Sequence, residues 1–373
     1  MKDLAVLKAV AADPGNYTRQ WKAETGGKVV GTFCSYAPEE LILAGGALAF
    51  RVVGGSGGTS SADAHLQSYS CSLVRGALAD ALDGRLDFLD GAIFPHTCDS
   101  IQRLSDIWRM NAPTGFHLDV VLPVKLNTDS ARHYMTQVLG NARTQLASLL
   151  GRSITDADLH RAIDVYNDIR RTMQRLYDLR SERPGIVSGS DVHAIVRASM
   201  VMARQEFLEC LTRVVAHLEG QDPGPPAGKR IFLSGGVCNL PDVYGIVEAA
   251  GGWVVADDLC TGSRGLTGRI DVEAGSDPIA AISERYAQRA ICPAKHTGIT
   301  GRGEELVRLA KKERADGVIF VFLKFCDPHA FDYPYLKGML DDAGIPSLLV
   351  ELEEQNVSQG QLQTRCEAFI EML

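Results

Sequence analysis

The sequence predicts an α/β fold built from two parallel-sheet units that are joined by helices. Three observations support this prediction: short apolar runs early in the chain, a helical stretch in the middle, and a second group of short apolar runs after it. Short, continuous apolar runs between helical segments are typical of strands buried on both faces of a parallel sheet. A chain of 373 residues is also long enough for two domains with large cores.

The first unit is expected over residues 1–128. Its predicted strands are Lys28–Thr32, Ala47–Val53, Gly91–Pro95 and His117–Pro123, and its predicted helices are Glu39–Ala44, Cys71–Leu82 and Ile101–Met110. Pro38 suits the start of a helix, and Glu39 and Glu40 then match the positive end of the helix dipole. The glycine-rich stretch Gly54–Ala64 is expected to be a loop.

A helical connecting region is expected over residues 129–222, followed by a second α/β unit over 223–373. Thr155 and Asp158 resemble a capping box, after which apolar residues recur every three or four positions. Gly220–Lys229 has the composition of a linker. The strands predicted after it are Arg230–Ser234, Gly252–Ala256, Gly317–Leu323 and Ser347–Glu351.

Composition excludes several classes of protein. The net charge of −8 and the pI near 5.6 argue against a nucleic-acid surface or a polybasic membrane anchor. No apolar run approaches the roughly 18 residues of a membrane span, and the N-terminus lacks the apolar core of a signal peptide. We therefore expect a cytoplasmic protein. In that reducing compartment the nine cysteines are not expected to form structural disulfides.

Two segments share one layout. Asp90–Asp99 (DGAIFPHTCD) and Asp316–Asp327 (DGVIFVFLKFCD) each contain an Asp-Gly turn, a buried strand and a Cys-Asp pair at the carboxyl end of the strand. Open α/β sheets form their binding sites at that end. The shared order of turn, strand and cysteine predicts that the two units have a duplicated layout.

The cysteines form the main candidate site. Cys98 and Cys326 would follow strand ends, and Cys71 would lie at a helix N-terminus, where a thiolate is stabilised. Three thiolates from separate loops can bind an iron–sulfur cluster or zinc, although the sequence has no CxxC pair. The other cysteines in or beside apolar segments are expected to be small core residues: Cys210, Cys238, Cys292 and Cys366.

Longer motifs in a fixed order carry a resemblance. They are YAPEELILAGG (Tyr36–Gly46), SYSCSLVRGAL (Ser68–Leu78), LDGAIFPHTCDSIQRLS (Leu89–Ser105), ADDLCTGSR (Ala256–Arg264), FCDPHAFDYPYLK (Phe325–Lys337) and GQLQTRCEAFIEML (Gly360–Leu373). Over nearly its full length the chain resembles the 2-hydroxyacyl-CoA dehydratase and benzoyl-CoA reductase family of iron–sulfur enzymes. It is most similar to the smaller, beta subunit of the dehydratases.

This resemblance implies Rossmann- or flavodoxin-like domains and one 4Fe-4S cluster held by Cys71, Cys98 and Cys326. Three thiolates leave one iron open, and an open iron acts as a Lewis acid as well as a redox centre. Cys34 is not expected to be an obligatory ligand, because the family motif tolerates other residues there. The catalytic candidates are Glu40 and Glu39, whose carboxylates could transfer a proton beside a bound thioester, Glu40 being preferred. Their ordinary role at a helix start is the competing interpretation.

The function implied by the resemblance is removal of water from a 2-hydroxyacyl-CoA after one-electron activation. A separate ATP-hydrolysing iron–sulfur activator would supply the electron, and a related larger subunit would share the site. The chain has no GxxxxGK[ST] phosphate loop of its own, which agrees with this division of labour. The alternatives are a subunit of an ATP-dependent benzoyl-CoA reductase and an electron-transfer protein with a double-cubane cluster.

Overall fold

The computed structural model describes residues 1–54, 57–112, 115–222, 224, 228–273, 275–289, 292–295, 298, 300–353 and 359–373. The described chain has an α/β fold with two four-stranded sheets, and all of their strand pairs are parallel. This confirms the predicted fold class. Parts of the predicted loop Gly54–Ala64 and linker Gly220–Lys229 lie outside the described residues.

The strands lie close to their predicted positions. In the described chain they are β1 (Val29–Thr32), β2 (Leu48–Arg51), β3 (Gly91–Pro95), β4 (Phe116–Val120), β5 (Lys229–Gly235), β6 (Gly252–Asp258), β7 (Gly317–Leu323) and β8 (Ser347–Leu352). All residues of β3 and β7 are buried, as their apolar sequences predicted. The largest difference is at β4, which ends at Val120 rather than at Pro123.

The helices of the described chain surround the sheets. They are α1 (Lys2–Ala12), α2 (Pro14–Thr25), α3 (Glu39–Ala44), α4 (Ser72–Leu82), α5 (Asp99–Asn111), α6 (Asp129–Leu150), α7 (Asp156–Glu182), α8 (Gly189–Ser199), α9 (Arg204–Glu219), α10 (Val243–Ala249), α11 (Pro278–Gln288), α12 (Gly301–Lys312), α13 (Asp327–Asp342) and α14 (Gln359–Met372). Thr155 and Asp158 form the predicted capping box at the start of α7. None of these helices is long and apolar enough to cross a bilayer.

Both sheets have the same strand order. The first is β2-β1-β3-β4 and the second is β6-β5-β7-β8. The strand order reverses between β1 and β3 in the first sheet and between β5 and β7 in the second. Ligands of such sheets bind outside the carboxyl ends of the strands at this switch point. The repeated segments predicted from the sequence contain β3 and β7, which occupy equivalent positions in the two sheets. The structure therefore confirms the duplicated layout.

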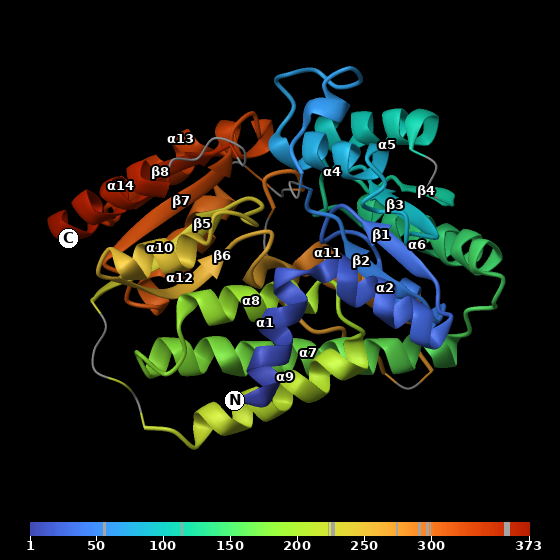
Figure 1. Ribbon diagram of the computed structural model, residues 1–373, viewed down its shortest axis with the longest axis horizontal. Coiled ribbons are helices and arrows are strands. Elements are labelled where there is room, and N and C mark those ends of the chain that lie inside the picture. The colour runs from blue at the N-terminus through green and yellow to red at the C-terminus, as the bar shows by residue number, and fades with distance from the viewer. Residues whose placement is uncertain are drawn as a thin grey trace.

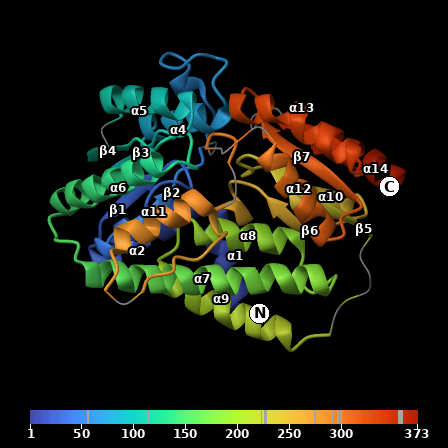
Figure 2. The ribbon, with the colours of Figure 1, turned by 180° about the vertical axis from the view of Figure 1, so that it is seen from behind.

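The two sheets lie side by side over a layer formed by α1, α7, α8 and α9 (Figures 1 and 2). One hydrophobic cluster includes Val29 of β1, Met173 of α7 and Ile231 of β5, so the sheets share a core. Helix α11 crosses back to the first sheet and packs against α6, with Ile282 in that sheet's second cluster. The domain boundaries at 128/129 and 222/223 remain predictions.

Candidate functional site

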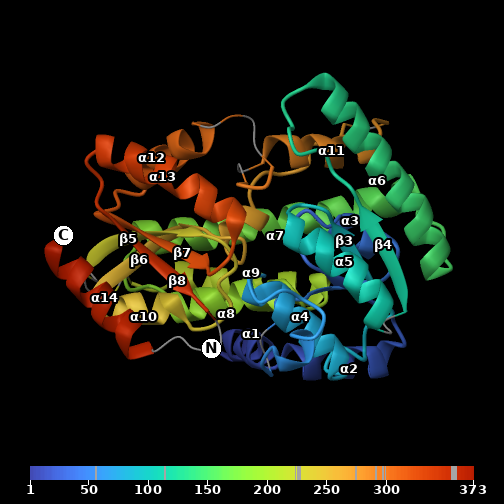
Figure 3. The same cartoon turned by 90° about the horizontal axis from the view of Figure 1, so that it is seen from above.

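Each of the three predicted cluster cysteines is the N-cap of a helix. Cys71 precedes α4, Cys98 precedes α5, and Cys326 precedes α13. Cys98 and Cys326 follow β3 and β7, the strands at the switch points of the two sheets. Helices α4, α5 and α13 gather on the side of the molecule opposite the α7–α9 layer (Figures 1 and 3). The positive ends of three helix dipoles therefore accompany the three thiols.

The three thiols are close enough to influence one another. Burial raises the pKa of Cys98 to about 12, and the charge of Cys71 contributes to this rise. Burial also raises the pKa of Cys326 well above its usual value, with further contributions from Cys71 and Cys98. The structure thus brings together the cysteines of both α/β units, and ionised thiolates here would repel one another without a bound cation.

The donor set of the described residues does not form a site for a single metal ion. Among the described residues, no three His, Cys, Asp or Glu side chains converge closely enough to hold one metal ion. A zinc ion requires such convergence, whereas the thiolates of an iron–sulfur cluster surround a larger inorganic core. In the part of the chain that the structure describes, two buried polar atoms nearby have no hydrogen-bond partner: Nη1 of Arg302 and Nδ1 of His329, three residues after Cys326. Three neighbouring thiols with unpaired donors beside them suit an anionic group such as a 4Fe-4S cluster, whose presence remains a prediction.

Three further cysteines border this region. Cys34 follows β1, and Arg264 Nη1 lies 3.1 Å from Cys260 Sγ. Burial raises the pKa of Cys292 to about 11, and the neighbouring thiol of Cys260 contributes. Cys292 is buried as predicted, but it adjoins the cysteine site, which the sequence did not indicate. Three other cysteines are buried in the main core, as predicted: Cys210, Cys238 and Cys366.

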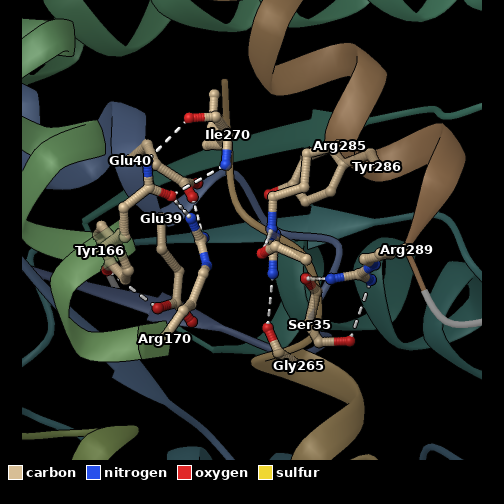
Figure 4. A network of polar contacts seen from close by, with 12 residues as sticks. Ser35, Glu39, Glu40, Tyr166, Arg170, Gly265, Ile270, Arg285, Tyr286 and Arg289 are labelled. Atoms are coloured by element: carbon tan, nitrogen blue, oxygen red, sulfur yellow. Dashed lines mark hydrogen bonds and ion pairs between the residues drawn. The ribbon is translucent and has the colours of Figure 1, made fainter. Parts of the chain in front are cut away.

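Glu39 and Glu40 begin α3, and arginines of neighbouring helices hold both carboxylates. Figure 4 shows both glutamates with Tyr166 and Arg170. Glu40 is 1% exposed and forms an ion pair with Arg170 of α7. Glu39 accepts hydrogen bonds from Tyr166 Oη at 3.0 Å and from Arg204 Nη2 at 3.1 Å. Both carboxylates line a cavity of about 60 Å³ that also reaches Cys260.

This geometry limits the proton chemistry of Glu40. Burial raises the pKa of its carboxyl group, but the charges of Arg170 and Arg285 outweigh burial and lower the pKa below the usual value. Glu40 is therefore ionised at neutral pH and is a poor general acid there. It can accept a proton only if Arg170 releases it. The catalytic role of Glu39 and Glu40 remains a prediction.

Sequence reasoning missed the arginines that hold these carboxylates. A signal was present: Arg170 follows Tyr166 by four residues and precedes Met173 by three, so it lies on the apolar face of α7. A charged residue on such a face must be paired when the helix packs, because an isolated buried charge is costly. The same reasoning applies to Arg285 on α11, which is 5% exposed.

Comparison with known proteins identifies the family of the chain. The family model described as 2-hydroxyglutaryl-CoA dehydratase, D-component, matches residues 34–373. The chain is 29% identical over 367 residues to the (R)-phenyllactyl-CoA dehydratase beta subunit of Clostridium sporogenes, covering 98% of this chain and 97% of the relative. It is 31% identical over 352 residues to a benzoyl-CoA reductase subunit of Thauera aromatica, covering 92% of this chain and 90% of the relative.

A further relative is the lactoyl-CoA dehydratase beta subunit of Anaerotignum propionicum, which is 28% identical over 375 residues, covering 99% of this chain and 98% of the relative. The family match and the relatives extend through the motifs that contain Cys71, Cys98 and Cys326. The relatives are named as subunits of dehydratases or of benzoyl-CoA reductase. The chain belongs to the 2-hydroxyglutaryl-CoA dehydratase D-component family, whose named members are enzyme subunits.

Proposed function

We propose that this chain is the iron–sulfur beta subunit of a radical 2-hydroxyacyl-CoA dehydratase. The proposal rests on the proximity of Cys71, Cys98 and Cys326, which come from both α/β units and each lie at the N-terminus of a helix. Full-length similarity to the beta subunits of phenyllactyl-CoA and lactoyl-CoA dehydratases supports it. The enzyme would remove water from a 2-hydroxyacyl-CoA together with a related larger subunit.

The chain's own residues would serve this reaction in distinct ways. A 4Fe-4S cluster, when bound, supplies low-potential one-electron chemistry and one iron without a protein thiolate. Cys71, Cys98 and Cys326 would hold it, and the ends of α4, α5 and α13 would stabilise its negative charge. The electron would come from a separate ATP-dependent iron–sulfur activator, and a sequence without a GxxxxGK[ST] phosphate loop agrees with this division of labour.

Iron binding tests the proposal directly. Protein purified without oxygen should contain about four irons per chain. Cys71→Ser, Cys98→Ser and Cys326→Ser should each lose stable iron, because a hydroxyl group is a poor replacement for thiolate on iron. Cys34→Ser and Cys260→Ser should retain it, and Cys366→Ser, on α14, is the matched control. A colourless wild-type protein that contains zinc, or a Cys71→Ser variant that keeps its iron, would contradict the proposal.

A second candidate is a subunit of an ATP-dependent benzoyl-CoA reductase. The observation that favours it is the 31% identity to the benzoyl-CoA reductase subunit of Thauera aromatica. The complex with its partner subunit, supplied with activator and ATP, should be assayed with 2-hydroxyacyl-CoA and with benzoyl-CoA. Dehydration of the hydroxyacyl thioester without ring reduction would support the dehydratase, and the reverse result would support the reductase.

A further inference from the structure

Three buried cations line the cysteine site without a carboxylate partner in the described part of the chain. They are Arg51, Arg289 and Lys295, which are 4%, 5% and 1% exposed. Lys295 Nζ donates to the carbonyl oxygens of His96 at 3.3 Å and Leu122 at 3.0 Å. Arg289 donates to Ser35 O at 2.8 Å (Figure 4), and the Nε of Arg51 has no hydrogen-bond partner among the residues that the structure describes. We call these three residues the cationic wall.

The cationic wall meets the thiols at the carboxyl edge of the first sheet. Arg51 pairs with Thr32 in the β1–β2 register, two residues before Cys34. Arg289 holds Ser35, directly after Cys34, and Lys295 holds His96, two residues before Cys98. The three cations therefore come from two parts of the chain, the end of β2 and the segment after α11, and lie beside the segments that carry Cys34 and Cys98.

Several carboxylates near the cationic wall already have other partners. Glu39 pairs with Arg204, Glu40 with Arg170, and Asp258 with Arg264 and Arg302, while Asp119 shares a hydrogen bond with His96. Buried charges in folded proteins are normally paired, because desolvation is costly. The uncompensated charge of the cationic wall thus points to a negatively charged occupant beside it.

We propose that the cationic wall compensates the negative charge of the cluster and raises its reduction potential. This inference rests on the proposed function. Reduction adds one electron, delivered by the ATP-dependent donor, and exchanges no atoms, so it makes the thiolate-bound cluster more negative by one charge. Positive charge in a water-poor region stabilises the reduced, more negative cluster to a greater extent than the oxidised cluster. Loss of a wall charge should therefore shift the midpoint potential to more negative values.

The matched variants separate charge from packing. Lys295→Met and Arg51→Met remove a buried charge and keep an unbranched apolar chain, whereas Lys295→Arg keeps the charge. Lys324→Met is the control: Lys324 lies two residues before Cys326, but its side chain is 50% exposed and pairs with Glu353. Water and salt screen such a charge, so its loss should leave the potential nearly unchanged.

The experiment is an EPR-monitored redox titration of each variant, purified without oxygen in complex with the partner subunit, together with its iron content. We expect Lys295→Met and Arg51→Met to retain iron and to titrate at more negative potential, with a larger shift in the double variant. Loss of iron from Lys295→Met but not from Lys295→Arg would also support charge compensation. Unchanged potentials in iron-loaded Lys295→Met and Arg51→Met would overturn this inference but would leave the proposed function standing. A wild-type complex without iron would contradict the proposed function, and the inference with it.

Discussion

Cys34 and Cys98 follow the paired strands β1 and β3, but their surroundings affect the two thiols in opposite directions. Burial raises the pKa of Cys98 to about 12. Burial also acts to raise the pKa of Cys34, but the Arg51 charge and a hydrogen bond with Thr97 outweigh it and lower the pKa below its usual value. The nearest fixed charge, and not burial, therefore decides which thiol ionises more easily.

The buried ion pair of Glu40 and Arg170 should contribute measurably to the stability of the protein. Glu40→Gln leaves the Arg170 charge in the interior without its counter-charge, which should cost about 3 kcal/mol of the free energy of unfolding. Because the folded-state pKa of Glu40 lies below its usual value of 4.5, the pair stabilises the protein above that pH. The stabilisation is lost as the pH falls through the folded-state pKa.

Urea unfolding of the wild type and Glu40→Gln at neutral pH and at acid pH measures this effect. The difference in the free energy of unfolding between the wild type and Glu40→Gln should shrink at acid pH. Glu39→Gln is the matched control, since the Glu39 side chain is 23% exposed and also accepts a hydrogen bond from Tyr166. Glu39→Gln should lower the free energy of unfolding by less than Glu40→Gln does. Equal stability of wild type and Glu40→Gln at neutral pH would contradict the prediction.

The sequence predicted the position of these carboxylates but not their partners. Helix-start preferences placed Glu39 and Glu40 in the first turn of α3, which depends only on neighbouring residues. Arg170 and Arg204 come from positions 130 and 165 residues away. Helical periodicity identifies the face on which an arginine lies, but it does not identify the element against which that face packs.

At the scale of elements, the repeated Asp-Gly turn fixes the start of each sheet in the same way. The Asp90 carboxylate accepts a hydrogen bond from the Val29 N–H at 2.8 Å, and Asp316 accepts one from the Arg230 N–H at 2.7 Å. The glycine that follows allows close packing, since a Cβ on Gly91 would lie 2.4 Å from the Phe116 ring. The Asp90 turn thus aligns β3 with β1, and the Asp316 turn aligns β7 with β5.

Removing either carboxylate should weaken its sheet. Asp90→Ala and Asp316→Ala each leave a strand N–H without its acceptor, which should cost about 1–2 kcal/mol in urea unfolding. Asp90→Asn and Asp316→Asn are the controls, because an amide oxygen can still accept the bond. Asp90→Ala should cost more than Asp316→Ala, since Asp90 also pairs with Lys22 at 2.8 Å. Alanine variants as stable as their asparagine counterparts would refute this role.

The elements themselves could be predicted where the pattern is local. Short apolar runs located the eight strands of the described chain, and the Thr155–Asp158 pair located the start of α7. The packing of α11 could not be predicted. Its sequence belongs to the second half of the chain, but Ile282 joins the cluster of the first sheet. Such crossing depends on the combined surfaces of many elements, which no single stretch of sequence encodes.

At the scale of the whole molecule, the cysteine site opens onto an apolar patch. A pocket beside Cys98 is also lined by Val124, Phe331 and Tyr335, whose exposed fractions are 56%, 78% and 55%. Large exposed apolar side chains gathered around a pocket are typical of protein interfaces. The relatives are named as subunits, so we expect the related larger subunit of the proposed enzyme to cover this patch.

The patch gives the prediction for the assembly. Phe331→Asp places a charge where an apolar ring would be buried against the partner, and a residue at the centre of an interface typically contributes more than about 1 kcal/mol. The dissociation constant of the two subunits should therefore rise by roughly tenfold or more. Met110→Asp is the matched control, because Met110 is 81% exposed but lies at the end of α5 opposite Cys98.

Analytical ultracentrifugation of the anaerobic complex measures both constants, and iron content confirms that each variant is folded. If Phe331→Asp binds its partner as tightly as Met110→Asp does, the larger subunit does not cover this patch, and the cysteine site opens to another surface of the assembly.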